Sequence, residues 1–153
     1  MSEEQKQAVF GIEKVYVKDI SLEIPNAPQI FLEQGSPTIS VEVHTNAQQL
    51  DEGVFEAVLT VTVTSKLEND KTVFLVEAAQ AGIFRISNVP QEDIEPLLGI
   101  ACPNILYPYV REVIADMVVR AGFPPVVLQP MNFENVYQQQ KLMQSAQQPA
   151  TTH

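Results

Sequence analysis

The residues with most potential for chemistry are one cysteine, two histidines and several carboxylates on expected strands. His44 falls on the expected solvent face of a strand and His153 in the C-terminal tail. Neither has a cysteine, histidine or carboxylate at metal-binding spacing, so no metal site is predicted. Cys102 at the start of a helix could have a lowered pKa. We prefer to interpret it as a small apolar residue beside a helix-starting proline, Pro103.

Catalysis would require groups that converge on a pocket. Glu56 and Glu77 fall on neighbouring expected strands and are the best acid–base candidates, but nothing in the pattern directs them into a cavity. The chain contains no G-x-x-x-x-G-K-[ST], G-x-G-x-x-G or G-x-S-x-G motif, and its six glycines leave little material for a phosphate-binding loop. We therefore predict no catalytic residues, no cofactor and no enzyme activity.

Two further carboxylates, Asp19 and Glu23, share one face of the expected first strand, because side chains alternate along a strand. They lie roughly 13 Å apart at about 3.3 Å per residue. The residues alone leave two interpretations open, namely solvation of an exposed face and a contact surface for a basic partner. Nine basic and nineteen acidic residues give a net charge of −10, which attracts basic partners.

The same charge balance argues against binding to nucleic-acid phosphates or to an anionic membrane surface. With 153 residues the chain can form one domain with a core, and a hydrophobic content of 45% excludes disorder throughout. No signal peptide or membrane-spanning window is visible, and a lone cysteine suits a reducing compartment. We expect a cytoplasmic protein with one domain over residues 1–153, including a flexible N-terminus at 1–9 and a disordered tail at 144–153.

Alternation of apolar and polar residues predicts four strands. The first covers Gly11–Ile24, with an irregularity near Val17 and Lys18 where the parity of the apolar residues changes, as it does at a β-bulge. Pro25 and Pro28 end this strand, and a long crossover connection follows. The other strands are expected at Thr38–Thr45, Val54–Leu67 and Val73–Ser87, the last two as an antiparallel hairpin.

The remaining pattern is helical. The stretch QEDIEPLLG predicts a short helix or turn, and Cys102 opens a long helix that Gly122 and Pro124 end. A second helix starts at Asn132. Together these elements predict an α+β fold: a four-stranded antiparallel sheet with a long crossover connection, followed by one long central helix and a shorter C-terminal helix.

The long helix has more apolar surface than one sheet can cover. Its apolar positions span an arc of about 140°, whereas packing on one sheet needs about 100°. Either the second helix and the proline-rich connection cover the surplus within the monomer, or these helices meet at the centre of an oligomer. We favour the oligomer. The interface residues expected on this helix are Leu106, Tyr109, Val110, Val113 and Met117.

Three segments carry a resemblance to a known family: VYVKDISLEIPNAPQIF, AGIF and CPNILYPYVREVIADMVVRAGFPPVVLQPMNF. From about Phe10 to Tyr137 the chain resembles SecB, the bacterial chaperone family for protein export. The resemblance implies the fold given above, in a homotetramer built as a dimer of dimers. It also implies ATP-independent holding of unfolded precursor proteins in the cytoplasm, for delivery to the motor ATPase SecA.

The resemblance further implies two binding surfaces. The basic, zinc-bearing C-terminal segment of SecA, in which the zinc belongs to the partner, is expected at Asp19, Glu23, Leu75 and Glu77. Clients are expected in long apolar grooves beside the crossover connection and the second helix. The residues expected to line these grooves are Phe31, Ile39, Val41, Val43, Phe133 and Tyr137. Family members often carry a tryptophan in the crossover connection, and since this chain has none, Phe31 is the expected aromatic anchor.

Two other classes of function compete with a chaperone. One is a carrier of a small apolar ligand, or a cryptic enzyme, that uses a closed apolar pocket between sheet and helix, and the other is a structural assembly protein. A carrier would saturate with one compound per subunit, whereas a chaperone would bind unrelated unfolded polypeptides according to their exposed apolar area.

Overall fold

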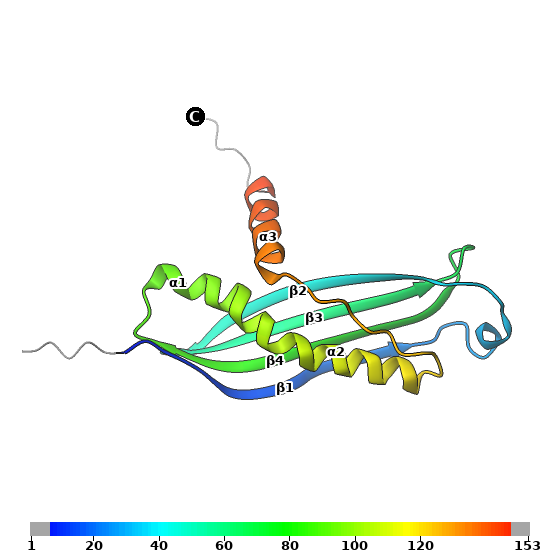
Figure 1. Cartoon of the computed structure of the whole chain (residues 1–153), viewed down its shortest axis with the longest axis horizontal. Helices are drawn as coiled ribbons and strands as arrows, with labels where there is room; N and C mark the ends of the chain where they lie inside the picture. The colour runs from blue at the N-terminus through cyan, green and yellow to red at the C-terminus, as the bar shows by residue number, and fades with distance from the viewer. Residues whose placement is uncertain (1–6, 148–153) are drawn as a thin grey trace, which may run out of the picture.

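Four long antiparallel strands form the centre of the computed structural model, which describes residues 7–147. The strands are β1 (Val9–Glu23), β2 (Thr38–Asp51), β3 (Val54–Lys66) and β4 (Thr72–Ser87), arranged in the order β1-β4-β3-β2 (Figure 1). β1 and β2 are consecutive in sequence but lie at opposite edges of the sheet. The connection between them, which contains the short helix η1 (Gln29–Leu32), therefore crosses the end of the sheet, as predicted.

β1 contains the irregularity predicted near Val17. Val17 pairs with Gln80 and Asp19 pairs with Ala79, so Lys18 is an extra residue in β1 at this point. Because side chains alternate between the two faces of a strand, an extra residue reverses the face of every residue that follows it.

β2 continues six residues beyond Thr45, where the sequence predicted its end. The added stretch NAQQLD contains no β-branched residue, which is why the prediction stopped early. Its backbone nevertheless pairs with β3, with Gln48 opposite Glu56, and a tight turn returns the chain. Gly53 occupies that turn at φ +70°, a conformation that glycine adopts at little cost. β1 likewise starts at Val9, inside the stretch 1–9 that was predicted to be flexible.

The helical region after β4 is longer than predicted. α1 (Gln91–Pro96), the π-helix η2 (Leu97–Ala101) and α2 (Cys102–Arg120) follow one another without a break, so the prediction that the long helix starts at Cys102 was wrong. The backbone N–H of Cys102 bonds to the carbonyl of Leu97, five residues earlier. This wider turn accommodates an extra residue and lets the helix continue through a proline-containing segment.

α2 ends at a glycine-based C-cap. Gly122 adopts φ +95°, the N–H of Phe123 bonds to the carbonyl of Val118 at 3.2 Å, and the N–H of Gly122 bonds to that of Val119 at 3.0 Å. These two bonds form a Schellman motif. The motif turns the chain into the connection 123–132, which returns over the sheet to the last helix (Figure 1).

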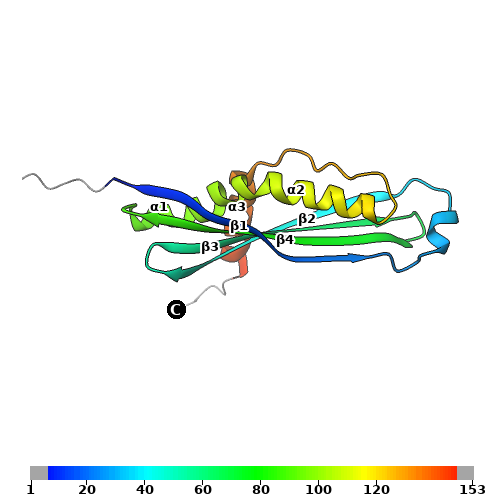
Figure 2. The ribbon, with the colours of Figure 1, turned by 90° about the horizontal axis from the view of Figure 1, so that it is seen from below.

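α2 lies lengthwise on one face of the sheet (Figure 2) and forms the core with alternate residues of β3 and β4. Its residues Leu106, Val110, Ile114 and Val118 recur every four positions and are 0% exposed. The prediction that Leu106 and Val110 belong to a subunit interface was therefore wrong, because both side chains are already buried against the chain's own sheet.

The apolar surplus of α2 lies beside this buried stripe. Tyr109 and Val119 are 50% and 51% exposed, and Val113 and Met117 are half-buried. α3 (Phe133–Gln147) does not cover them, because it projects away from the sheet and packs against η2 (Figure 1).

α3 starts as predicted. The side-chain Oδ1 of Asn132 accepts a hydrogen bond from the N–H of Asn135 at 3.1 Å, which is an N-cap. The helix runs to Gln147, so disorder was wrongly predicted for residues 144–147. The rest of that predicted tail, 148–153, and residues 1–6 of the predicted flexible N-terminus lie outside the described residues.

We expect Leu106→Ala to lower the free energy of unfolding by about 2–5 kcal/mol, because a buried leucine leaves a cavity when it is truncated. Leu106 packs over Gly82, where an added Cβ would lie 3.2 Å from the leucine Cδ2, so the sheet has no side chain there to fill the space. The matched control is Leu142→Ala, an exposed leucine on α3 whose loss should cost about 0.5 kcal/mol or less. Urea unfolding of both variants measures the difference, and equal losses would contradict the assignment of Leu106 to the core.

Candidate functional site

The face of the sheet opposite α2, here called the open face, carries the four residues predicted to bind SecA. Glu23 on β1 pairs directly with Leu75 on β4. Asp19 lies four residues before Glu23, and Glu77 lies two residues after Leu75, so alternation places all four on the same face of two adjacent strands. Asp19 and Glu23 are exposed, and Leu75 and Glu77 are half-buried. We call this group of four residues the acidic face.

The hydroxyl of Thr62 on β3 donates a hydrogen bond to Glu77 Oε2 at 2.7 Å, which orients the carboxylate at the centre of the open face. Thr62 pairs in turn with Glu42 on β2, so a further exposed carboxylate lies in the same row near the opposite edge. Sequence reasoning did not associate Glu42 with this face, because the residues alone do not give the register between β2 and β3.

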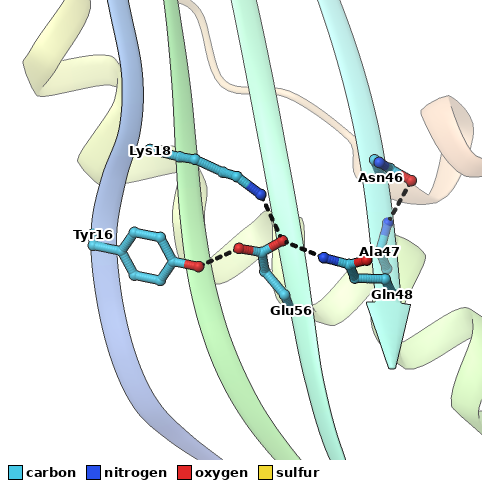
Figure 3. A network of polar contacts seen from close by, with 6 residues as sticks. All are labelled: Tyr16, Lys18, Asn46, Ala47, Gln48 and Glu56. Atoms are coloured by element: carbon cyan, nitrogen blue, oxygen red, sulfur yellow. Dashed lines mark hydrogen bonds and ion pairs between the residues drawn. The ribbon is translucent and has the colours of Figure 1, made fainter. Parts of the chain in front are cut away.

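Glu56 and Glu77, the two carboxylates considered as acid–base candidates, do not come together. Glu77 pairs with Thr62, which lies six residues from Glu56 along β3, a separation of roughly 20 Å at about 3.3 Å per residue. Glu56 is instead the centre of a polar network on the open face (Figure 3).

Glu56 is only 6% exposed and accepts hydrogen bonds from residues on two other strands. Lys18 Nζ on β1 lies 2.8 Å from Oε1, Gln48 Nε2 on β2 donates to the same oxygen at 3.2 Å, and the Tyr16 hydroxyl on β1 donates to Oε2. β1 and β3 are separated by β4, so Tyr16 and Lys18 reach across an entire strand (Figure 3). Sequence reasoning missed this network, although a lone glutamate in a strand of valines and threonines and the nearby parity change both point to it.

The network keeps Glu56 ionised and Tyr16 protonated at neutral pH. Burial alone raises the pKa of Glu56, but the hydrogen bonds from Lys18, Tyr16 and Gln48 and the charge of Lys18 together outweigh it and lower the pKa. Burial, the hydrogen bond to Glu56 and its negative charge raise the pKa of Tyr16 to about 12. At neutral pH the group is therefore a carboxylate held by an ammonium, a phenol and an amide. Because the pKa of Glu56 is lowered on folding, its stabilising contribution is present above its unfolded pKa and is lost as the pH falls through its folded pKa.

Cys102 does not have the properties of a reactive thiol. It lies within the continuous helix, is fully buried, and burial raises its pKa to about 12. The alternative of an activated cysteine at a helix start was therefore wrong.

His44 is exposed on β2, and among residues 7–147 no three His, Cys, Asp or Glu side chains are placed to hold a metal ion. In the same range, no helix is long and apolar enough to cross a membrane.

An apolar groove lies on the other face of the sheet, between the edge strand β2 and the connection that leads to α3. It consists of two adjoining hollows of about 540 and 570 Å³ that share Val41 and Met131. On the β2 side, Ile39 also lines the first hollow, and Val43, His44 and Thr45 line the second. Residues 125–131 form the opposite wall of the first hollow. Ile39 and Val41 remain 40% and 41% exposed, so β2 presents apolar surface that the chain does not itself cover.

The other predicted groove residues have different places. Phe31 is exposed and stacks on Phe123 with ring centroids 5.1 Å apart, at the start of the connection rather than in either hollow. Tyr137 packs against Gly99 and faces a separate hollow of mixed polarity between α1, η2, β2 and α3. Phe133 is 1% exposed, so the prediction that it contacts clients was wrong.

Phe133 supports the wall of the groove from behind. Its ring meets the ring of Tyr107 edge-on with centroids 5.4 Å apart, and the Tyr107 hydroxyl donates a hydrogen bond to the carbonyl of Gln129 in the connection. The two aromatic residues therefore hold the connection at a fixed position opposite β2.

A family model described as preprotein translocase subunit SecB matches residues 3–144 of the chain. The chain belongs to the SecB family. It is 61% identical over 158 residues to the protein-export protein SecB of Methylobacillus flagellatus, with all of both chains covered. It is also 58% identical over 143 residues to that of Neisseria gonorrhoeae, covering 94% of this chain and 97% of the relative. The family resemblance inferred from the motifs is thereby confirmed.

The fold agrees with this membership. A SecB-like chaperone of Mycobacterium tuberculosis, solved with a peptide from an antitoxin, superposes with a TM-score of 0.67 at 16% identity, over 80% of this chain and 91% of that chain. At this identity the likeness concerns the fold alone. With the family membership, it identifies the chain as a protein-export chaperone.

Proposed function

We propose that this protein holds unfolded precursor proteins in its apolar groove without ATP and delivers them to SecA through its acidic face. The observation that carries the proposal is the presence of both surfaces on opposite faces of one sheet. One surface is apolar and only partly covered, and the other is polar and carries carboxylates.

The groove has the chemistry needed to bind unfolded chains of unrelated sequence. Ile39, Val41 and Val43 offer apolar area without a closed pocket, and burial of such area is favourable in proportion to its size and not to any particular sequence. β2, which carries Ile39 and Val41, is an edge strand of the sheet. An extended client segment can therefore lie along the groove, and the fixed wall at Tyr107 reduces the entropy lost when the client binds.

The acidic face has the chemistry needed to bind the basic segment of SecA. Asp19, Glu23 and Glu77 provide negative charge that accelerates encounter with a basic partner. Leu75 pairs with Glu23, lies two residues from Glu77, and supplies apolar contact that salt does not screen. The net charge of −10 extends this attraction beyond the contact itself.

We further propose that the protein acts in the cytoplasm as a homotetramer, a dimer of dimers. The support is the uncovered apolar surface of α2, where Tyr109, Val113, Met117 and Val119 are not fully buried by the chain itself. A surface of this kind is covered most simply by copies of the same chain around a symmetry axis.

Native mass spectrometry at micromolar concentration should give about four times the 17.0 kDa mass of one chain. Replacing Tyr109 and Val119 by serine should shift the population toward smaller species, because both changes remove apolar area from the proposed interface. A wild-type protein that is monomeric at this concentration would contradict the assembly.

Replacing Ile39, Val41 and Val43 by alanine should strongly weaken the holding of a slow-folding precursor, because each fully used site contributes about 1 kcal/mol or more of apolar transfer. Suppression of client aggregation measures the effect, with native mass as the check on assembly. Leu142→Ala is the matched control, since this leucine is exposed on α3 and lines neither hollow. If the triple variant suppresses aggregation as well as the control does, the client surface lies elsewhere.

Replacing Asp19 by asparagine and Glu23 by glutamine should weaken binding of the SecA segment at least tenfold, about 1.4 kcal/mol. Two negative charges are lost while shape and polarity are kept. Glu92→Gln with Asp93→Asn makes the same change in net charge on the exposed face of α1 and should leave the affinity nearly unchanged. Isothermal titration calorimetry at several salt concentrations gives the affinities, and client holding should be unaltered. A wild-type affinity in the double variant would mean that Asp19 and Glu23 serve solvation only.

A further inference from the structure

The position of the acidic face depends on the bulge at Lys18. In a regular strand, Asp19 would lie on the face opposite to Tyr16 and Lys18, which is the face that carries α2. The extra residue moves Asp19 and Glu23 to the open face, where Glu23 pairs with Leu75. A shift of the bulge along β1 would therefore turn some or all of these carboxylates away from a partner on that face.

The apolar side of β1 holds this register only weakly. β1 is an edge strand, and on either side of the bulge Val17 and Ile20 are each 41% exposed in the chain. Val15, two residues before Val17, and Leu22, farther along, are only partly buried against the core. Burial of apolar side chains normally fixes the register of a strand. In β1 the apolar side chains on either side of the bulge are poorly buried, so burial contributes little to the register there.

Polar contacts hold the bulge from both faces. On the open face, Lys18 Nζ and the Tyr16 hydroxyl both bind the Glu56 carboxylate on β3 (Figure 3). On the other face, Gln80 Nε2 on β4 donates a hydrogen bond to the backbone carbonyl of Tyr16 at 3.1 Å. Ala81, which pairs with Tyr16, has a side chain small enough for the tyrosine and lysine side chains to cross β4.

We propose that Glu56 is a positioning residue for the contact with SecA. By binding Tyr16 and Lys18 together, it fixes the bulge, and the bulge places Asp19 and Glu23 in register with the β4 part of the acidic face. Glu56 is 6% exposed, so it acts through β1 and not by touching the partner. The inference rests on the proposed function of the acidic face.

Replacing Lys18 provides a test, because a positioning role and simple electrostatics predict opposite changes in the affinity for the basic segment. Lys18→Met removes a positive charge beside the acidic face, which by charge alone would strengthen the attraction for a basic segment. If the lysine positions the bulge, the same change weakens binding. Lys14→Met is the matched control. Lys14 also lies on the open face of β1, pairing with Ile83, and among residues 7–147 it forms no ion pair with Glu56.

Calorimetric titration with the synthetic zinc-loaded C-terminal segment of SecA at about 0.15 M salt compares these variants in the full chain. We expect Lys18→Met to bind at least fivefold more weakly than wild type, and Lys14→Met to bind as tightly or slightly more tightly. Glu56→Ala should weaken binding to a similar extent, and Glu56→Gln, which keeps one acceptor oxygen, should lose less. Native mass and client holding should stay unchanged, and amide hydrogen exchange should accelerate in peptides from β1.

The inference is overturned if Lys18→Met binds the SecA segment as tightly as wild type or more tightly, while the Asp19→Asn, Glu23→Gln variant has lost affinity. If that double variant binds normally, the proposed SecA contact itself fails, and with it the assigned role of Glu56. Loss of client holding or of the native mass in Lys18→Met would show a general structural defect and would also contradict a role confined to the acidic face.

Discussion

In a four-stranded sheet covered by one helix, every second residue of β3 and β4 is directed at α2 and the residues between them at the opposite face. Leu106, Val110, Ile114 and Val118 of the helix are fully buried in this contact, and each is worth about 1.5–3 kcal/mol of apolar transfer. The two faces of the sheet therefore cannot exchange roles without loss of the core. The open face is thereby free to carry charge. The two binding surfaces of the proposed function follow from this alternation, because the groove continues the helix side beyond α2 and the acidic face occupies the other side.

β1 meets this constraint only by interrupting its own regularity. It must present apolar residues to the helix side along its whole length, yet also place Asp19 and Glu23 on the open face. Extra residues at Glu13 and at Lys18 reconcile the two patterns, at the cost of a ladder that is locally disrupted at each. A buried carboxylate would ordinarily be expensive at such a place, but the three donors around Glu56 satisfy it and lower its pKa. On the proposal made above, the contacts of Glu56 therefore both stabilise the fold at the bulge and place Asp19 and Glu23.

The strands with strong alternation were predictable to within a few residues, and so was the bulge, because the parity of β1 changes at Val17 and Lys18. The second half of β2 was not, since its glutamines and asparagine become a strand only through pairing with β3. Proline and cysteine at 102–103 suggested a helix start where a π-turn instead continues the helix. The family resemblance predicted the residues of the acidic face and of the β2 side of the groove, and their binding roles stay predictions. The burial of Phe133 was not predictable because it depends on how Tyr107 packs, and the Glu56 network depends on register across three strands.

The arrangement of the two surfaces has a consequence for the order of events in export. A client lying along Ile39 and Val41 contacts the helix side of β2, whereas a segment bound at Glu23 and Leu75 contacts the open face of β1 and β4. The sheet separates the two sites, and its order places β2 and β1 at opposite edges. If the proposed function is right, neither partner has to displace the other, and SecA could bind a chaperone that is still loaded. On the proposed function, release of the client would then come from competition by the motor for the precursor.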